Sequence, residues 1–160
     1  ITIGFVDIPL LVQSHLKCLR INLKLSHDCV YKVGARSVLN SGKSAIYLAL
    51  DNSNNIVGYV CGEVSNLHRI SHIMKMNIGV LKEFHGLGVG RVLADAIINH
   101  AEKIGILRME ATVITSNKLS FNLCKKFGFK VEGMREKSIK IDGNFHDEYL
   151  IARFSSPDFV

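Results

Sequence analysis

Three alternating glycines in one short segment give the most specific chemical signal in this sequence. The segment spans residues 84–91 and contains Gly86, Gly88 and Gly90, and an amphipathic helical pattern begins at Arg91. Glycine permits backbone conformations closed to other residues and lets a ligand approach the main chain. A helix that starts there directs its free N–H groups and the positive end of its dipole at the loop. The segment therefore predicts a binding site for a phosphate group.

Two well-known phosphate motifs do not fit this spacing. A dinucleotide fingerprint needs a third glycine where Arg91 stands,. Residues 42–44 resemble the end of a P-loop, but Ser37 stands at the position of its first glycine, and a strand is expected to follow,. A glycine-rich turn without any ligand remains the alternative, although three such glycines cost conformational entropy on folding.

Apolar spacing predicts the elements that position this loop. Strands are predicted over 1–6, 44–50, 56–64, 71–80, 108–114, 129–141 and 146–154,. A helical stretch follows Pro9, a helix or loop covers 25–38, and helices follow at 91–104 and after a cap at Ser116 or Asn117,. This order predicts one α/β (α+β) domain over 1–160. It would hold a mixed, mostly antiparallel sheet of six to seven strands, flanked by about four helices.

Composition narrows the function classes. The chain has 160 residues, 48% apolar, and a net charge of +6 that is spread thinly without a dense basic run, which argues against a nucleic-acid surface,. The charge is either a solvated basic surface or a positive field that helps attract an anionic cofactor. No apolar run approaches membrane-spanning length, and the N-terminal residues lack a signal-peptide pattern, so we expect a cytoplasmic protein without a membrane segment,. His68 and His72 lack a third ligand nearby, so we expect no metal,.

A second motif follows the glycine loop along the chain. It consists of Asn117, the pair Leu123-Cys124 and the pair Gly128-Phe129. Together with the loop and the preceding residues 77–80, it resembles the GCN5-related N-acetyltransferase (GNAT) superfamily over most of the domain, most strongly from about 77 to 152. The ending, 131–149, resembles the branch that holds polyamine, antibiotic and ribosomal-protein acetyltransferases.

The resemblance implies acetyl-coenzyme A (acetyl-CoA) as the acetyl donor. The loop would hold its pyrophosphate, the strand before the loop its pantetheine arm, and the Val80 N–H the oxygen of the reacting acetyl group. Asn117 would cap a helix or bond the pantetheine, and both roles are compatible. The residues that would contact acetyl-CoA are Ile78, Gly79, Val80, His85, Gly86, Leu87, Gly88, Val89, Gly90, Arg91, Asn117 and Ser120.

The proton-transfer residues depart from the family pattern. Cys124 stands where the family often has the tyrosine that protonates the leaving thiolate, and it is either that acid or a packing residue,. Thr112 stands where several related enzymes carry a glutamate base. The remaining candidates are Glu63 and Glu110 as bases and Tyr149 in place of the missing tyrosine, each also readable as a surface or cross-strand residue,.

These inferences predict an N-acetyltransferase that moves an acetyl group from acetyl-CoA to a primary amine by direct attack in a ternary complex. The alternative is a non-catalytic acyl-CoA-binding module or sensor. The amine could belong to a small molecule or a protein. Residues 10–38, expected to shape the acceptor pocket, hold only one acidic residue, Asp28, which argues mildly against a polyamine. The sequence leaves the oligomeric state open, and a homodimer is one arrangement it allows.

Overall fold

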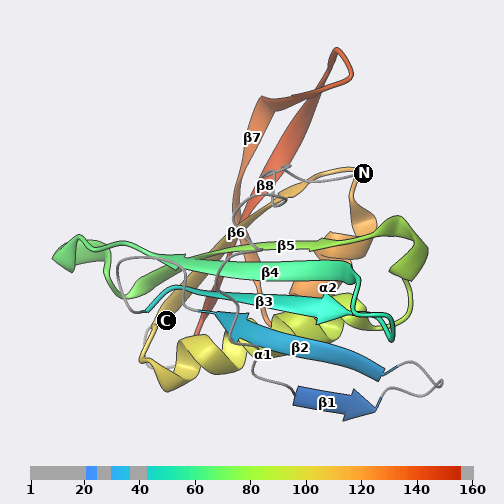
Figure 1. Ribbon diagram of the computed structural model, residues 1–160. Coiled ribbons are helices and arrows are strands. Elements are labelled where there is room, and N and C mark those ends of the chain that lie inside the picture. Colours follow the sequence, from blue (N-terminus) through green and yellow to red (C-terminus); the bar gives the residue numbers. More distant parts are fainter. Residues whose placement is uncertain (1–20, 25–29, 37–42, 156–160) are drawn as a thin grey trace.

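The computed structural model of the protein describes residues 21–24, 30–36 and 43–155, with side chains from Lys43 onward. These residues form one eight-stranded sheet and two α-helices (Figure 1). The elements in chain order are β1 (Ile21–Lys24), β2 (Val30–Arg36), β3 (Ala45–Leu50), β4 (Ile56–Val64), β5 (Ile73–Val80), α1 (Val89–Lys103), β6 (Arg108–Ile114), α2 (Lys118–Lys126), β7 (Lys130–Ile141) and β8 (Asn144–Phe154).

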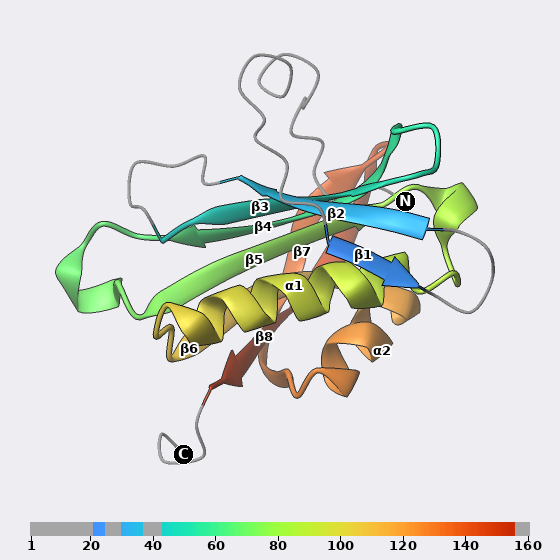
Figure 2. The same cartoon turned by 60° about the horizontal axis from the view of Figure 1, so that its bottom comes forward.

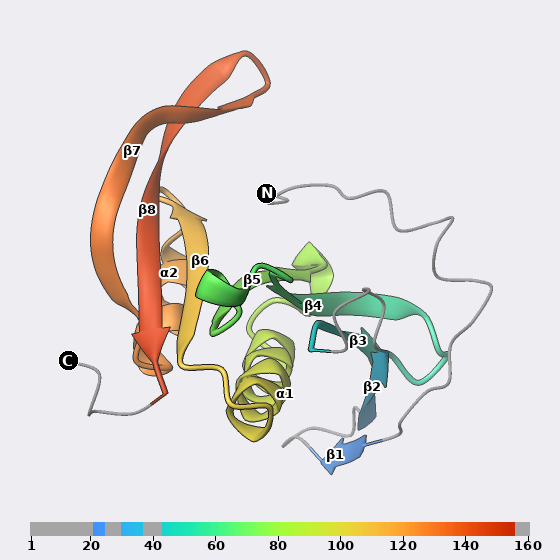
Figure 3. The ribbon, with the colours of Figure 1, turned by 90° about the vertical axis from the view of Figure 1, so that its left-hand side faces the viewer.

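The strands lie in the order β1-β2-β3-β4-β5-β6-β8-β7. Every neighbouring pair is antiparallel except β5 and β6, which are parallel and joined through α1. The first five strands therefore form a meander, and the last three form a second antiparallel group. The long β7–β8 hairpin extends well beyond the rest of the sheet (Figure 3).

Both α-helices lie on the same side of the sheet (Figure 2). The core between α1 and the sheet is dense, and Leu93, Ile97 and Ala101 are all fully buried. Gly62 of β4 allows this close approach, because a Cβ there would lie only 2.8 Å from the Ile97 Cδ1 atom. The even-numbered residues of β4 and β5, such as Gly62 and Met74, therefore face α1. The odd-numbered residues of these strands face away from it.

Most predicted elements from residue 44 onward are confirmed. The strands predicted over 56–64 and 108–114 have the predicted bounds, and Asn117 is the N-cap of α2. The helix after the glycine loop begins at Val89, two residues before Arg91. In α2 the buried face passes through Cys124, whereas Leu119 is exposed.

The prediction of about four helices is wrong for the described part of the chain. Residues 21–24 and 30–36 are strands where a helical stretch and a helix or loop were predicted, so the sheet has eight strands, not six or seven. Short apolar runs do not distinguish strand from helix by periodicity alone. The predicted strand 1–6 and the start of the first helical stretch fall outside the described residues. No helix within the described ranges is long and apolar enough to cross a membrane.

Candidate active site

The two groups of strands separate along the junction of β5 and β6. Their parallel pairing covers only three residue pairs, Ile73 with Arg108, Met74 with Met109 and Lys75 with Glu110. Beyond this point β5 continues to Val80 and β6 to Ile114, and the two strands no longer pair (Figure 1). The sheet is therefore open between the carboxyl ends of β5 and β6.

The hydrogen-bond register of β5 determines which backbone groups face this opening. The Leu81 N–H donates to the Val57 carbonyl at 2.9 Å, and the register places Gly58 opposite Val80. Because the direction of backbone N–H and C=O groups alternates along an antiparallel ladder, those of Gly79 point toward β4. Those of Ile78 and Val80 point the other way, into the opening.

A pocket occupies the opening. It is small, with about 20 Å³ open to the centre of a water-sized sphere, and is lined by β5, β6 and α2. The lining residues are Met76, Asn77, Ile78, Ala111, Thr112, Val113, Ser120 and Cys124. Three residues predicted to lie in the site, Ile78, Ser120 and Cys124, thus come together from two separate elements.

The glycine loop lies at the end of β5 and leads into α1. Gly86 and Gly88 have φ angles of 77° and 85°, which favour glycine over residues with a Cβ atom,. Gly88 is the N-cap of α1, and no side chain caps the helix there. The first N–H groups of α1, those of Val89 and its successors, therefore keep their capacity for an anion.

Gly90 is needed for a different reason. A Cβ atom at this position would lie 3.3 Å from Cδ2 of Leu123 in α2 and 3.8 Å from Cγ2 of Val80 in β5. The absence of a side chain brings the start of α1 close to both elements. The loop, the open end of β5 and the pocket-lining helix α2 are therefore neighbours.

His85 joins the loop to the end of β5. Its exposed ring places Nε2 2.9 Å from the Val80 carbonyl oxygen, so a protonated Nε2 donates a hydrogen bond to it. The Val80–Leu81 peptide is thus held on both sides, since its N–H donates to Val57. His85 fixes the strand end from which the Val80 N–H points into the opening.

Asn117 and Cys124 hold the pocket-lining helix. The Asn117 side-chain oxygen accepts a hydrogen bond from the Ser120 N–H at 3.1 Å, which caps α2. Cys124 is 5% exposed, and burial raises the pKa of its thiol to about 11. The thiol is therefore protonated at neutral pH and is a weaker acid than a free cysteine.

Three further candidates lie outside the pocket lining. Tyr149 of β8 packs against Phe121 of α2, with the ring centroids 5.1 Å apart. Glu63 and Glu110 both lie level with Lys75, at the closed end of the opening. A strand rises about 3.3 Å per residue, so this level is roughly 16 Å along β5 from Val80. The structure does not bring these two carboxylates to the end of β5.

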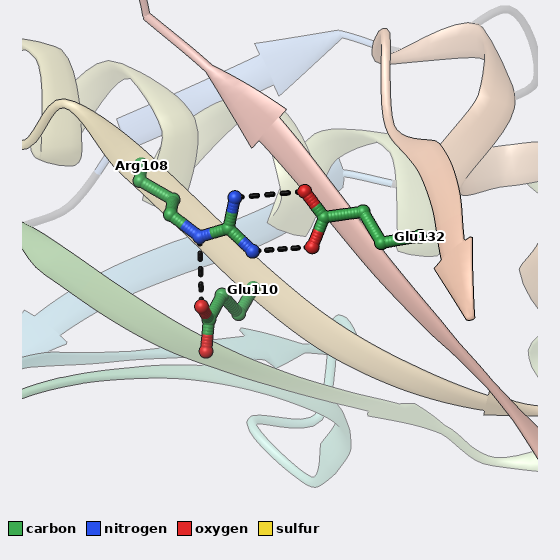
Figure 4. Close-up of polar contacts among 3 residues, drawn as sticks. All are labelled: Arg108, Glu110 and Glu132. Carbon is green, nitrogen blue, oxygen red and sulfur yellow. Dashed lines mark hydrogen bonds and ion pairs between the residues drawn. The ribbon is translucent and has the colours of Figure 1, made fainter. Parts of the chain in front are cut away.

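Glu110 belongs to an ion-pair network instead (Figure 4). Arg108 Nε donates to the Glu110 carboxylate at 2.7 Å, and both terminal nitrogens of Arg108 bind Glu132 of β7, one of them at 2.8 Å. These contacts raise the pKa of Arg108 and lower that of Glu132. The network links β6 to β7 across the intervening β8, on the sheet face away from the helices.

Sequence reasoning missed Tyr59 of β4. The register sets it opposite Gly79, and its ring occupies the space where a side chain of residue 79 would lie. An aromatic residue in one strand and a glycine in the next are visible in the sequence. Their pairing depends on the β4–β5 register, which the sequence does not show directly.

The described residues contain no group of three His, Cys, Asp or Glu side chains able to hold a metal ion. The features that could hold a ligand are instead backbone ones, namely the uncapped start of α1, the backbone groups of Ile78 and the N–H of Val80, which face the opening. They suit a long, partly amide-like ligand with a phosphate-bearing end.

Comparison with known proteins identifies the family. A family model described as an acetyltransferase (GNAT) domain matches residues 34–150, so the chain belongs to the GNAT family of acetyltransferases. This confirms the resemblance seen in the sequence.

Individual relatives agree with the family match. The L-amino acid N-acetyltransferase AaaT of Escherichia coli is 29% identical over 100 residues, which cover 62% of each protein. A GNAT-family acetyltransferase from Streptococcus pneumoniae is 31% identical with a TM-score of 0.68, covering 72% of this chain and 69% of that one. A phosphinothricin acetyltransferase from Sinorhizobium meliloti, solved in complex with acetyl-CoA, has the same fold at 21% identity and a TM-score of 0.65, covering 71% and 63%.

Proposed function

We propose that this protein is an N-acetyltransferase that uses acetyl-CoA to acetylate a primary amine. The observation that carries the proposal is the end of the β5–β6 pairing after Lys75 and Glu110, which leaves Ile78 lining a pocket and the Val80 N–H facing the opening. The family membership and the acetyl-CoA complex of a protein with this fold support the same donor.

The chain's own groups would hold acetyl-CoA in three places. The N–H groups at the start of α1 and in loop 85–90 would bind its pyrophosphate, aided by the helix dipole. The backbone of Ile78 would pair with the pantetheine arm as a neighbouring strand does. Bound acetyl-CoA would supply the acetyl thioester. The Val80 N–H would donate to the acetyl oxygen, a contribution commonly worth roughly 3 kcal/mol.

Proton transfer at this site would depend on water and on weak acids. Cys124 lines the pocket with a protonated thiol whose pKa is about 11. It could hydrogen-bond to the departing sulfur, but it is poorly matched as a proton donor at neutral pH. Alignment of the amine with the thioester would then supply much of the rate, an effect worth roughly 7–11 kcal/mol in favourable cases.

The test is release of free coenzyme A thiol by the purified protein with acetyl-CoA and a panel of amines. L-amino acids come first in the panel, because the E. coli relative is named for them. Aminoglycosides, polyamines and peptides with free N-termini follow. We expect thiol release that depends on both the amine and the protein.

Calorimetry with acetyl-CoA separates the two ways in which this assay can fail. Binding of acetyl-CoA without turnover of any amine would favour the alternative, an acyl-CoA-binding module or sensor. Absence of acetyl-CoA binding would overturn the proposed site itself.

A further inference from the structure

One aromatic side chain lies directly over the strand that ends in the proposed reaction centre. A Cβ atom built on Gly79 would lie 2.6 Å from Cε1 of Tyr59, 3.1 Å from Cζ and 3.3 Å from Cδ1. The edge of the Tyr59 ring therefore crosses the position above Gly79, and the hydroxyl on Cζ extends past the point of closest approach. Gly79 is the residue between Ile78 and Val80, whose backbone groups face the opening.

The ring lies on the sheet face away from α1 and α2. Gly58 and Gly62 of β4 face α1, since a Cβ atom on either would contact Leu93 or Ile97. Side chains alternate between the two sheet faces along a strand. Tyr59 directly follows Gly58, so its side chain points to the opposite face. The uncapped start of α1 lies on the helix side, so a donor bound there would reach the opening from that side. The face that carries Tyr59 is then left for the acceptor.

We propose that Tyr59 forms a wall of the amine-acceptor site, with its ring over Gly79 and its hydroxyl beside the point where the acetyl group is presented. This inference rests on the proposed N-acetyltransferase function and names a residue of its acceptor side. The ring would contact the carbon skeleton of the amine and exclude water on one side of it.

The surroundings of Tyr59 suit this role. The side chain is half-buried, and burial raises the pKa of its hydroxyl, which therefore stays protonated at neutral pH. Along the same face the next cross-strand pair is Cys61 with Asn77, and Asn77 also lines the pocket. The Tyr59 ring and the pocket are thus one residue pair apart on the same two strands.

Tyr47 offers a matched control. It is also half-buried on a strand next to β4, and burial raises its pKa too. Its ring packs edge-on against His100 near the end of α1, on the helix face, and β4 separates its strand from β5. A response shared by both tyrosines would report a general change, whereas a response of Tyr59 alone would report the site.

The closing experiment uses protein labelled with 3-fluorotyrosine, whose four tyrosine signals are assigned with single Tyr→Phe variants. Acetyl-CoA is titrated while its binding is followed by calorimetry. We expect the ¹⁹F resonance of Tyr59 to shift with the same saturation as the calorimetric binding, while that of Tyr47 stays unchanged. Binding with an unmoved Tyr59 resonance would overturn the inference, whereas absence of binding would overturn the proposed function instead.

Kinetics with the best amine of the thiol-release panel provide a second readout. We expect Tyr59→Leu to raise the KM for the amine by about tenfold or more and to leave the KM for acetyl-CoA within about twofold. Tyr59→Phe, which keeps the ring, should restore most of the amine affinity, and Tyr47→Phe should resemble the parent. Equal effects of Tyr59→Leu on both substrates, or none on the amine, would show that the ring serves only to cover Gly79.

Discussion

Burial decides what Cys124 can contribute at the scale of a single residue. The sequence places a thiol where the family often has a phenol, and a free thiol would match the basicity of the coenzyme A thiolate. In the folded protein the Cys124 thiol has a pKa of about 11 and is 5% exposed. Its environment therefore favours a packing role with a hydrogen bond over a role as the principal acid.

The substitution Cys124→Ser tests this assignment. A serine keeps the size and the hydrogen-bonding capacity but has almost no acidity, so we expect kcat to stay within about tenfold of the parent and the KM for acetyl-CoA to stay similar. The measurement is steady-state kinetics with the best amine. A loss of several hundredfold in kcat at unchanged acetyl-CoA affinity would instead identify Cys124 as the acid.

Cys124 also predicts a pH dependence of stability. Its folded-state pKa is raised from the ordinary 9.0 to about 11 by burial, so the unfolded chain loses this proton first as the pH rises. The stability linked to Cys124 is complete below pH 9 and is lost between about pH 9 and 11, a change on the order of 3 kcal/mol. Urea unfolding across this range should show a shallower decline in Cys124→Ser, and equal slopes for both proteins would contradict the raised pKa.

At the scale of elements, the start of α1 owes its anion-binding geometry to Gly88. Its φ of 85° places the N-cap in the left-handed region, where a β-branched residue is strained,. Gly105, just beyond the other end of α1, has a similar φ of 73° with open space around it. The helix thus has, at each end, a glycine position at which a residue with a Cβ atom would be strained. Only Gly88 lies near the proposed phosphate site.

We therefore predict different effects of valine at these two positions. Gly88→Val should abolish acetyl-CoA binding in calorimetry while circular dichroism shows a retained fold. Gly105→Val should cost similar stability, roughly 1–2 kcal/mol, and keep the affinity. Unchanged acetyl-CoA affinity in Gly88→Val would contradict the assignment of the loop, and equal losses in both variants would attribute the effect to strain in α1.

The same elements show how far the sequence could predict this structure. The 3.6-residue repeat through Leu93 and Ile97 predicts α1, because a long helix buries one continuous face. The strands at 21–24 and 30–36 were missed, since four to seven residues carry too little periodicity to exclude a helix,. The loop glycines were found from local spacing. The remoteness of Glu63 and Glu110 from Val80, and the position of Tyr59, depend on strand register, which only the folded sheet provides.

At the scale of the whole molecule, the sheet consists of two antiparallel groups joined at β5 and β6. The join has three residue pairs, and the Arg108 network lies beside it and ties β6 to β7. The exposure of these ion pairs limits their stabilising effect to about 1 kcal/mol or less each. The core beneath α1, which contacts both sides of the join, holds the two groups together more strongly.

This arrangement predicts a pattern of amide exchange along β5. The N–H groups of Asn77 and Gly79 are directed at β4, whereas those of Ile78 and Val80 face the opening without a partner strand. We expect hydrogen–deuterium exchange measured by NMR to be faster at Ile78 and Val80 than at Gly79, and acetyl-CoA to slow it at these two positions. Equal protection of adjacent residues without acetyl-CoA would contradict the register of the open end.

The three-pair join also bears on how the chain folds. Within the meander of β1 to β5 and within the β7–β8 hairpin, neighbouring strands are close in sequence, so their contacts form with little loss of chain entropy,. The β5–β6 contact must enclose the whole of α1, and the β6–β8 contact must enclose α2 and β7, so both cost more chain entropy,. The β5–β6 join has only three residue pairs, so we expect it to form late, after the folding transition state. Acetyl-CoA bound at the β5–β6 join would then slow unfolding and lengthen the lifetime of the native state. It would leave the refolding rate almost unchanged.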